Sequence, residues 1–233
     1  MNYIKAVLFD LDGALIDTVP GLTKTINTLL QKYNKPSLAS DIIRRSALKG
    51  GASLITQGFN ISHEHPDFSS IKNEFLTIYR ENITATTKIS PEIVTLLNQL
   101  EAQNIKWGVV TNKPGWLTMP LLDTLNLSDK AFAIINGDTL HVKKSHPGPI
   151  LHARLQASCE LSECVYVSAS EWHILAGIRA ETKTAVASFG YISEADTPES
   201  WGADKMLNEP LELLNWIDEI NQTSGLSSLK IAG

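Results

Sequence analysis

Apolar residues open the chain as one short unbroken run. The run covers residues 6–9, Ala-Val-Leu-Phe, and it stops at Asp10, followed by Leu11, Asp12 and Gly13. An apolar run of this length with polar residues and a glycine at its end is typical of a strand that is buried on both faces. The first element is therefore predicted to be a buried strand.

Between residues 18 and 87 the apolar positions recur every three or four residues, which is the spacing of amphipathic helices. One helix is expected to begin after Thr18 and to end at residues 34–37, Asn-Lys-Pro-Ser. Two shorter helices are expected at 39–48 and 51–59, and a long one at about 67–82. This region carries no strand signal, so it is predicted to be entirely helical.

From Ser90 onward, short apolar runs alternate with helical patterns. Ser90-Pro91-Glu92 combines a capping residue, a proline and an acidic residue, which together favour a helix start. The predicted strands of this region cover residues 107–111, 131–135, 164–168 and 184–188. Two helices are predicted to begin after Ser90 and at Pro114. Three more are predicted at residues 149–157, 171–181 and 210–217. Strands that alternate with helices favour a doubly wound parallel α/β sheet.

The two patterns predict two domains. An α/β core domain would consist of residues 1–17 and 88–220, and an all-helical cap domain, residues 18–87, would be inserted just after the first strand. Residues 221–233 are expected to form a loose tail. Ligands of open α/β sheets bind at the carboxyl ends of the strands. A domain inserted at that end could therefore act as a lid.

Charge and composition exclude several classes of function. The 233 residues carry a net charge of −5 and no run of Lys and Arg, which argues against nucleic acid as a partner. No apolar stretch approaches the roughly 20 residues that cross a bilayer, so we expect no membrane association. Cys159 and Cys164 are too few for a disulfide framework. We expect a cytoplasmic protein with reduced thiols, either a monomer or a homodimer.

Asp10 and Asp12 are the first candidates for chemistry. Because side chains of a strand alternate between its faces, both carboxylates are expected to point the same way, with Leu11 pointing into the core. Gly13 allows a backbone conformation that other residues resist. Two neighbouring carboxylates suit a hard metal ion or an acid/base pair. A solvated turn or a helix cap is the alternative reading of the same residues.

Three other segments are expected to lie near Asp10. Thr111-Asn112 follows a strand and precedes a helix, where a hydroxyl, an amide and backbone N–H groups could hold a phosphate. Lys143-Lys144 could neutralise an anion, although a surface lysine is the alternative. Residues 165–173 form the end of another strand and the start of a helix.

These residues resemble the haloacid dehalogenase superfamily of phosphotransferases. Residues 10–18 match the first motif of that superfamily, Asp-x-Asp-Gly-x-Leu-x-Asp-Thr, almost residue for residue. Thr111 matches the second motif and Lys144 the third. The helical insertion is similar to that of the phosphoglycolate phosphatase branch. Residues 107–114, 191–192 and 201–204 are similar to N-acetylmuramic acid 6-phosphate phosphatases.

The resemblance implies a role for each matched residue. Asp10 would attack phosphorus and form an aspartyl-phosphate, and Asp12 would act as general acid and base. Thr111, Asn112 and Lys144 would bind the phosphoryl oxygens. A Mg²⁺ cofactor would be held by Asp10, by the backbone carbonyl of Asp12 and by a carboxylate of the fourth motif. The substrate would be a small phosphorylated metabolite.

The fourth motif departs from the pattern of the superfamily. The superfamily has Gly-Asp, then three residues, then Asp, whereas this chain has Ser168-Ala169 and then His173, so both carboxylates are missing. Ser145 also replaces the usual proline after the lysine. Mg²⁺ needs only one or two carboxylates, so Glu171 is a possible substitute ligand, and His173 could instead carry a proton.

Three classes of function remain open at this point. The first is a phosphatase that hydrolyses a phosphate monoester of the phosphoglycolate or sugar phosphate type, weakened by the missing carboxylates. The second is an inactive protein of the same fold that binds a phosphorylated metabolite. The third is dehalogenation, which uses an aspartate nucleophile without a metal ion but has no use for Asp12.

Substrate selection is expected to depend on the helical insertion, near Lys49-Gly50-Gly51 and the adjacent Arg44 and Arg45. Two neighbouring arginines could bind a carboxylate. A solvated helix face is the alternative for this arginine pair.

Overall fold

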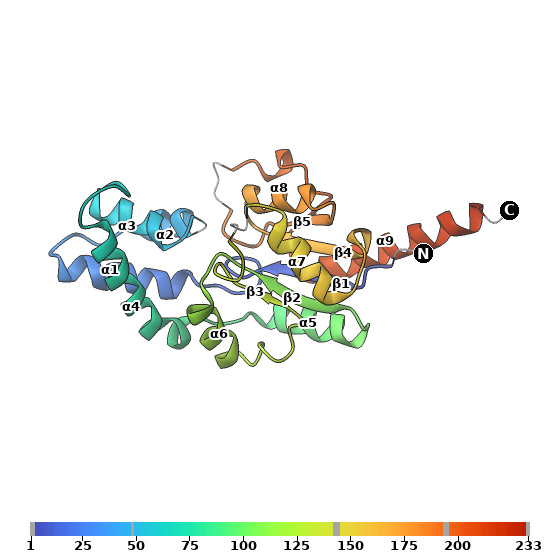
Figure 1. Ribbon diagram of the computed structural model, residues 1–233, viewed down its shortest axis with the longest axis horizontal. Helices are drawn as coiled ribbons and strands as arrows, with labels where there is room; N and C mark the ends of the chain where they lie inside the picture. The colour runs from blue at the N-terminus through green and yellow to red at the C-terminus, as the bar shows by residue number, and fades with distance from the viewer. Residues whose placement is uncertain (1–2, 48, 142–144, 193–195, 232–233) are drawn as a thin grey trace. The chain divides into compact units, whose positions relative to one another are not determined.

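The computed structural model describes residues 3–47, 49–141, 145–192 and 196–231. The chain divides into two compact units. Residues up to 15 together with residues 89 onward form an α/β unit, and Ile16–Lys88 forms a helical unit. Figure 1 shows the elements of each unit, which are described separately below.

The α/β unit contains a six-stranded parallel sheet, so the predicted doubly wound fold is confirmed. The spatial order of its strands is β3-β2-β1-β4-β5-β6. The strands are β1 (Ala6–Asp10), β2 (Lys106–Val110), β3 (Ile134–Ile135), β4 (Cys164–Ser168), β5 (Lys183–Ala187) and β6 (Lys205–Leu207).

Strand β1 lies at the centre of this sheet, between β2 and β4. All five of its residues are buried, which is why its sequence is apolar without alternation. Asp10 lies opposite Val110 of β2, and Phe9 lies opposite Val167 of β4. The chain fills one side of β1 with β2 and β3 before it crosses to β4 on the other side. Open α/β sheets bind ligands at such a switch point, beyond the carboxyl ends of the strands.

Helices cover both faces of the sheet, with α7 and α8 on one face and α5 on the other (Figure 1). The helices of this unit are α5 (Pro91–Ala102), α6 (Gly115–Thr124), α7 (Gly148–Ala157), α8 (Glu171–Arg179) and α9 (Glu212–Ile231), with short 3₁₀ turns at Leu161–Glu163 and Pro198–Ser200. Helix α5 begins as its sequence predicts, because the Ser90 side chain accepts a hydrogen bond from the Ile93 N–H at 3.2 Å.

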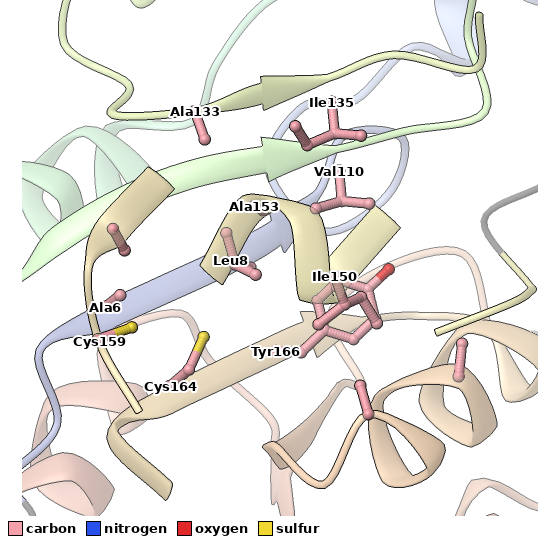
Figure 2. Packing of buried hydrophobic residues seen from close by; sticks show 13 residues of the cluster. Ala6, Leu8, Val110, Ala133, Ile135, Ile150, Ala153, Cys159, Cys164 and Tyr166 are labelled. Atoms are coloured by element: carbon pink, nitrogen blue, oxygen red, sulfur yellow. The ribbon is translucent and has the colours of Figure 1, made fainter. Parts of the chain in front are cut away.

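One hydrophobic cluster joins α7 and α8 to the sheet (Figure 2). Ile150 and Ala153 of α7 pack against Leu8 of β1 and Tyr166 of β4, and all four are fully buried. The two cysteine sulfurs, of Cys159 and Cys164, lie at one end of the cluster as free thiols. This packing fixes β1 and β4 side by side, and the carboxyl ends of these two strands carry Asp10 and Ser168.

The helical unit consists of α1 (Val19–Lys32), α2 (Ser40–Ala47), α3 (Gly51–Phe59) and α4 (Phe68–Thr86). Its core includes Ile26 and Leu30 of α1 together with Phe75 and Tyr79 of α4, whose rings stack with centroids 6.0 Å apart. Gly51 lets α3 approach α4 closely, because a Cβ atom at Gly51 would lie 2.6 Å from Cε1 of Phe75.

The structure differs from the sequence prediction in four elements. Helix α4 continues to Thr86 rather than ending at about residue 82, and β3 has two residues rather than five. The short edge strand β6 was not predicted, because three residues are too few to show a periodic pattern. Of the expected loose tail over 221–233, the described part, residues 221–231, belongs to α9.

Residues at the start of the expected tail form hydrogen bonds with other parts of the α/β unit and within α9. The Asn221 side chain accepts a hydrogen bond from the Ile4 N–H at 2.8 Å, and the Thr223 hydroxyl donates to the Glu219 carbonyl at 2.8 Å. Polar residues that predict a loop by composition therefore continue the helix here. Among the helices of the described residues, none is long and apolar enough to cross a bilayer.

Candidate active site

Asp10 is the last residue of β1, and it lies at the carboxyl edge of the sheet with only 4% of its surface exposed. Asp12 lies beyond the strand, in the turn that follows it, so the alternation of strand side chains does not extend to it. Leu11 is fully buried, as predicted. Gly13 has a φ of +85°, and a Cβ atom there would lie 2.9 Å from Cδ2 of the buried Tyr191. Only glycine fits this turn without strain.

The Asp10 carboxylate is held by two side chains from the β4–α8 segment. The Ser168 hydroxyl donates to Asp10 Oδ2 at 3.0 Å, and His173 Nδ1 lies 2.9 Å from the same oxygen. Ser168 is fully buried, and the His173 side chain is 11% exposed. An ionised carboxylate can only accept hydrogen bonds. His173 Nδ1 therefore carries the proton of this contact.

His173 also reaches the loop that follows β2. Its Nε2 atom lies 3.3 Å from Nδ2 of Asn112. With Nδ1 donating to Asp10, a neutral imidazole has Nε2 as an acceptor, and the Asn112 amide can donate to it. One hydrogen-bonded chain thus runs from Asp10 through His173 to Asn112. The structure brings these three predicted residues together.

Asp12 has a partner that the sequence reasoning missed. Lys113 Nζ lies 3.2 Å from Asp12 Oδ1, and the lysine side chain is only 8% exposed. The sequence offered a signal, because Lys113 directly follows Thr111 and Asn112, which were already placed at the site. A lysine three residues after a buried strand is usually a surface residue. Here its long side chain reaches back to the end of β1.

Thr111 is buried at the end of β2. Its backbone N–H donates to the Ile135 carbonyl at 2.9 Å, and its hydroxyl oxygen accepts the Lys113 N–H at 3.1 Å. Since that oxygen accepts, the hydroxyl proton can be donated to an acceptor such as a phosphoryl oxygen. The loop that carries Asn112 is closely packed, because a Cβ atom at Gly137 would lie 2.1 Å from the Asn112 carbonyl oxygen.

Ser168 is the second residue that the sequence reasoning missed. The sequence shows it as a glycine-to-serine departure that adds a side chain to a crowded turn, and no role was predicted from that. In the structure its hydroxyl donates to Asp10. Ser168 Oγ also lies 3.4 Å from His173 Nδ1. Two of the three departures of the fourth motif, Ser168 and His173, therefore meet on the same carboxylate.

A buried tyrosine under the site contributes to its electrostatics. Burial raises the pKa of the Tyr166 phenol well above its ordinary value of 10.0, and the charge of Asp10 raises this pKa further. A hydrogen bond with Ser168 acts in the opposite direction on the same pKa. The phenol consequently stays neutral and adds no second negative charge beside Asp10.

The other predicted site residues have different positions. Lys144 lies outside the described residues. Ala169 is fully buried beside Ser168, and Glu171 is exposed in the first turn of α8. Lys49 is exposed, and Gly50, with a φ of +83°, caps the start of α3.

The adjacent arginines of the helical unit lie in α2. Arg44 and Arg45 are both exposed, and Arg45 forms an ion pair with Asp41 of the same helix at 2.9 Å. An exposed pair four residues apart on a helix is worth about 0.3–0.5 kcal/mol. The neighbouring helix α3 begins at Gly51, which packs closely on Phe75.

The residues at Asp10 do not fit the magnesium ion that the resemblance implies. Mg²⁺ prefers oxygen ligands in an octahedral arrangement, and the fourth-motif positions offer Ala169 and an imidazole instead of two carboxylates. Among the described residues, no group of three or more His, Cys, Asp or Glu side chains is arranged to hold a metal ion. The imidazole is instead a hydrogen-bond partner of Asp10.

Comparison with known proteins adds a second line of evidence. The sequence profile of a family described as haloacid dehalogenase-like hydrolase matches residues 7–187. The chain is 31% identical over 215 residues to an N-acetylmuramic acid 6-phosphate phosphatase of Pseudomonas putida, a match that covers 92% of this chain and 96% of that protein. It is 32% identical over 216 residues to a phosphoglycolate phosphatase of Xanthomonas campestris pv. campestris, with 91% and 96% covered.

The fold is also similar to that of solved structures. A crystal structure of a predicted phosphoglycolate phosphatase from Haemophilus somnus 129pt matches with a TM-score of 0.80 and 22% identity. This match covers 91% of this chain and 97% of the other. At this level of identity the similarity supports the arrangement of the strands and helices around Asp10.

Proposed function

Since the chain belongs to the haloacid dehalogenase-like hydrolase family, we propose that it is a phosphatase that hydrolyses a small phosphate monoester through Asp10. The observation that carries this proposal is the position of Asp10. It is a buried carboxylate at the carboxyl end of the central strand, held in one orientation by Ser168 and His173. A fixed carboxylate at a switch point of the sheet is suited to nucleophilic attack.

The reaction has two steps. Before the first step, Asp12 takes up a proton from water. In that step a carboxylate oxygen of Asp10 forms a bond to phosphorus, the bond between phosphorus and the ester oxygen breaks, and Asp12 gives its proton to the departing oxygen. In the second, a water oxygen attacks phosphorus and gives its proton to Asp12. The bond between phosphorus and Asp10 then breaks. Inorganic phosphate leaves, and both aspartates return to their starting states.

Positive charge and hydrogen-bond donors compensate for the repulsion between two anions. Asp10 and a phosphate repel each other, and one unit-charge pair at 4 Å is worth about 4 kcal/mol at an effective dielectric of 20. Lys113 is close to Asp12 and brings a cation to the same turn. Thr111 can donate its hydroxyl proton to a phosphoryl oxygen. Lys144 is proposed as another phosphate ligand.

We infer the substrate class from the named relatives. Both phosphoglycolate and N-acetylmuramic acid 6-phosphate carry a carboxylate besides their phosphate. We propose that the helical unit selects the substrate, because it enters the chain directly after the turn of Asp12. Arg44 and Lys49 are exposed cations of that unit that could pair with a substrate carboxylate. Arg45 serves as the control, because it is a neighbouring cation of the same helix and it pairs with Asp41.

The test is phosphate release by wild type and Asp10→Asn. The substrates are p-nitrophenyl phosphate, phosphoglycolate and N-acetylmuramic acid 6-phosphate. We expect turnover of at least one of them by wild type and a loss of about a thousandfold or more in Asp10→Asn. Arg44→Met and Lys49→Met are expected to raise KM for the carboxylate-bearing substrates more than for p-nitrophenyl phosphate. Arg45→Met should leave KM unchanged both for the carboxylate-bearing substrates and for p-nitrophenyl phosphate.

A second candidate function is binding without catalysis. It is favoured by the ion pair and hydrogen bonds that already hold both carboxylates, Asp12 by Lys113 and Asp10 by His173. A protein of this kind would bind phosphate esters but would release no phosphate from them. A thermal shift caused by p-nitrophenyl phosphate in wild type, with no turnover above that of Asp10→Asn, would support binding over hydrolysis.

A further inference from the structure

We propose that His173 and Ser168 take the place of a divalent cation at Asp10, so that the Asp10 carboxylate is held without Mg²⁺ and the site excludes this ion. The proposal concerns the residues around Asp10, and it rests on the phosphatase function only where turnover is measured. Its starting observation is that two side chains, from positions where the family's fourth motif differs in this chain, meet on one carboxylate oxygen.

The contacts at Asp10 fill the acceptor sites of that oxygen. Each carboxylate oxygen offers about two lone pairs. Asp10 Oδ2 accepts one hydrogen bond from Ser168 at 3.0 Å and one from His173 at 2.9 Å. A magnesium ion at this oxygen would need a separation of about 2.0–2.1 Å. It would therefore have to displace one of the two donors.

His173 is also fixed from its other side. Its Nε2 atom faces Asn112 Nδ2 at 3.3 Å, so moving the ring away from Asp10 would break a hydrogen bond at each nitrogen. Its side chain is 11% exposed. A buried polar group that loses its partners costs about 1–3 kcal/mol. The imidazole ring is thus fixed in the site by contacts at both of its nitrogens. It presents nitrogen atoms, whereas Mg²⁺ prefers oxygen ligands.

The positive charge of Lys113 also disfavours a magnesium ion at this site. The carboxylate of Asp12 forms an ion pair with Lys113, whose side chain is almost fully buried. A divalent cation near Asp12 would be repelled by this ammonium group, which has little water around it to screen the repulsion. Both carboxylates of the first motif are therefore already bound by a donor or a cation of the protein.

The direct test is titration with Mg²⁺ alone, followed by isothermal calorimetry, on wild type and His173→Asp. The aspartate restores a carboxylate next to Asp10 and removes the imidazole. We expect His173→Asp to bind Mg²⁺ at least about tenfold more tightly than wild type, which corresponds to about 1.4 kcal/mol. His173→Asn is the second variant, because it removes the imidazole without adding charge, and it should bind Mg²⁺ no better than wild type.

Trp172→Asp is the matched control. It adds the same charge one residue away, at a side chain that is 66% exposed and does not face Asp10 through any described contact. A general attraction of Mg²⁺ to added negative charge would appear equally in both aspartate variants. We expect the Mg²⁺ affinity of Trp172→Asp to stay within about twofold of wild type. Equal gains in the two variants would overturn the proposal.

Turnover in EDTA and in Mg²⁺ separates this proposal from the proposed function. If wild type turns over substrate at the same rate in EDTA and in Mg²⁺, the result supports the present proposal and the phosphatase function. Turnover only with Mg²⁺, or tight Mg²⁺ binding by wild type that Asp10→Asn abolishes, overturns the present proposal and leaves the phosphatase function intact. No turnover in either buffer, with Mg²⁺ binding gained in His173→Asp, supports the present proposal and rejects the phosphatase function.

Discussion

Lys113 Nζ lies 3.2 Å from Asp12 Oδ1, and this ion pair connects the turn after β1 to the start of α6. The lysine side chain is 8% exposed and that of Asp12 is 25% exposed, so water screens the pair only in part. The pair fixes the position of the carboxylate that is proposed to move the proton. We therefore expect Lys113 to affect both stability and the proposed turnover through the same contact.

Lys113→Met should lower both stability and turnover. It leaves Asp12 without its cation, and we expect a loss of about 1–3 kcal/mol in the free energy of unfolding, less than for a fully buried pair. Turnover of p-nitrophenyl phosphate should fall by about 10- to 100-fold, because Asp12 loses its fixed position. Lys205→Met is the control, since its pair with Glu219 at 3.4 Å is exposed and should be worth less than about 1 kcal/mol. Equal effects of the two substitutions would contradict this assignment.

Alanine substitutions at Gly13 and Gly202 distinguish the stability cost of backbone strain from the cost of a steric clash. Both have a positive φ, +85° and +79°, so alanine at either costs about 1–2 kcal/mol in the left-handed region. At Gly13 the added Cβ atom also meets Tyr191 at 2.9 Å, whereas at Gly202 the nearest atom is 3.6 Å away. Chemical denaturation should show Gly13→Ala to be the more destabilised by about 1–3 kcal/mol. Gly13→Ala should also lose turnover, because Asp12 lies in the same turn.

The hydroxyl of Thr111 can be tested with a matched pair of variants. Thr111→Ser keeps the hydroxyl, and Thr111→Val removes it while keeping the branched shape. A hydrogen bond to a charged group is worth about 1.5–3 kcal/mol. We therefore expect Thr111→Val to raise KM for p-nitrophenyl phosphate about tenfold or more, and Thr111→Ser to raise it less than about threefold. If the two variants have the same KM, Thr111 does not bind the phosphate.

Glu163 predicts a pH dependence of stability. A hydrogen bond from Lys5, at 2.8 Å, and another from the Glu160 backbone lower the pKa of the Glu163 carboxyl below its ordinary value of 4.5. Because the unfolded chain then binds the proton more readily, the stabilisation is complete above about pH 4.5 and is lost as the pH falls through the folded-state pKa. Glu163→Gln should be less stable than wild type at pH 7, and the difference should shrink toward pH 3.

Lys5→Met serves as the control for this pH dependence, because it removes the same cation and leaves the carboxyl in place. Its stability difference from wild type should shrink over the same pH range. A difference between Glu163→Gln and wild type that is equal at pH 7 and pH 3 would show that the Lys5 charge does not act through Glu163.

Local patterns were enough to predict the centre of the fold. The unbroken apolar run of β1, the capping of α5 by Ser90 and the alternation of strands and helices each depend on residues close in sequence. These local patterns also predict the positions of Asp10, which ends β1, and of Thr111, which directly follows β2. Lys113 and Ser168 could not be placed in this way, since their partners, Asp12 and Asp10, are 101 and 158 residues away.

The remaining differences have similar causes. Strand β6 has three residues, and its pairing with β5 depends on the finished sheet rather than on its own sequence. The extension of α9 depends partly on the contact between Asn221 and Ile4, at opposite ends of the chain. Composition alone predicts a polar stretch of this kind to be a loop. Tertiary contacts override the local preference at both places.

The most direct test of the central claim is phosphate release from p-nitrophenyl phosphate by wild type and Asp10→Asn, measured side by side in EDTA. The position of Asp10 at the end of β1, held by Ser168 and His173, predicts turnover by wild type that falls about a thousandfold or more in Asp10→Asn. Equal rates for the two proteins, both in EDTA and after addition of Mg²⁺, would contradict a nucleophilic role for Asp10.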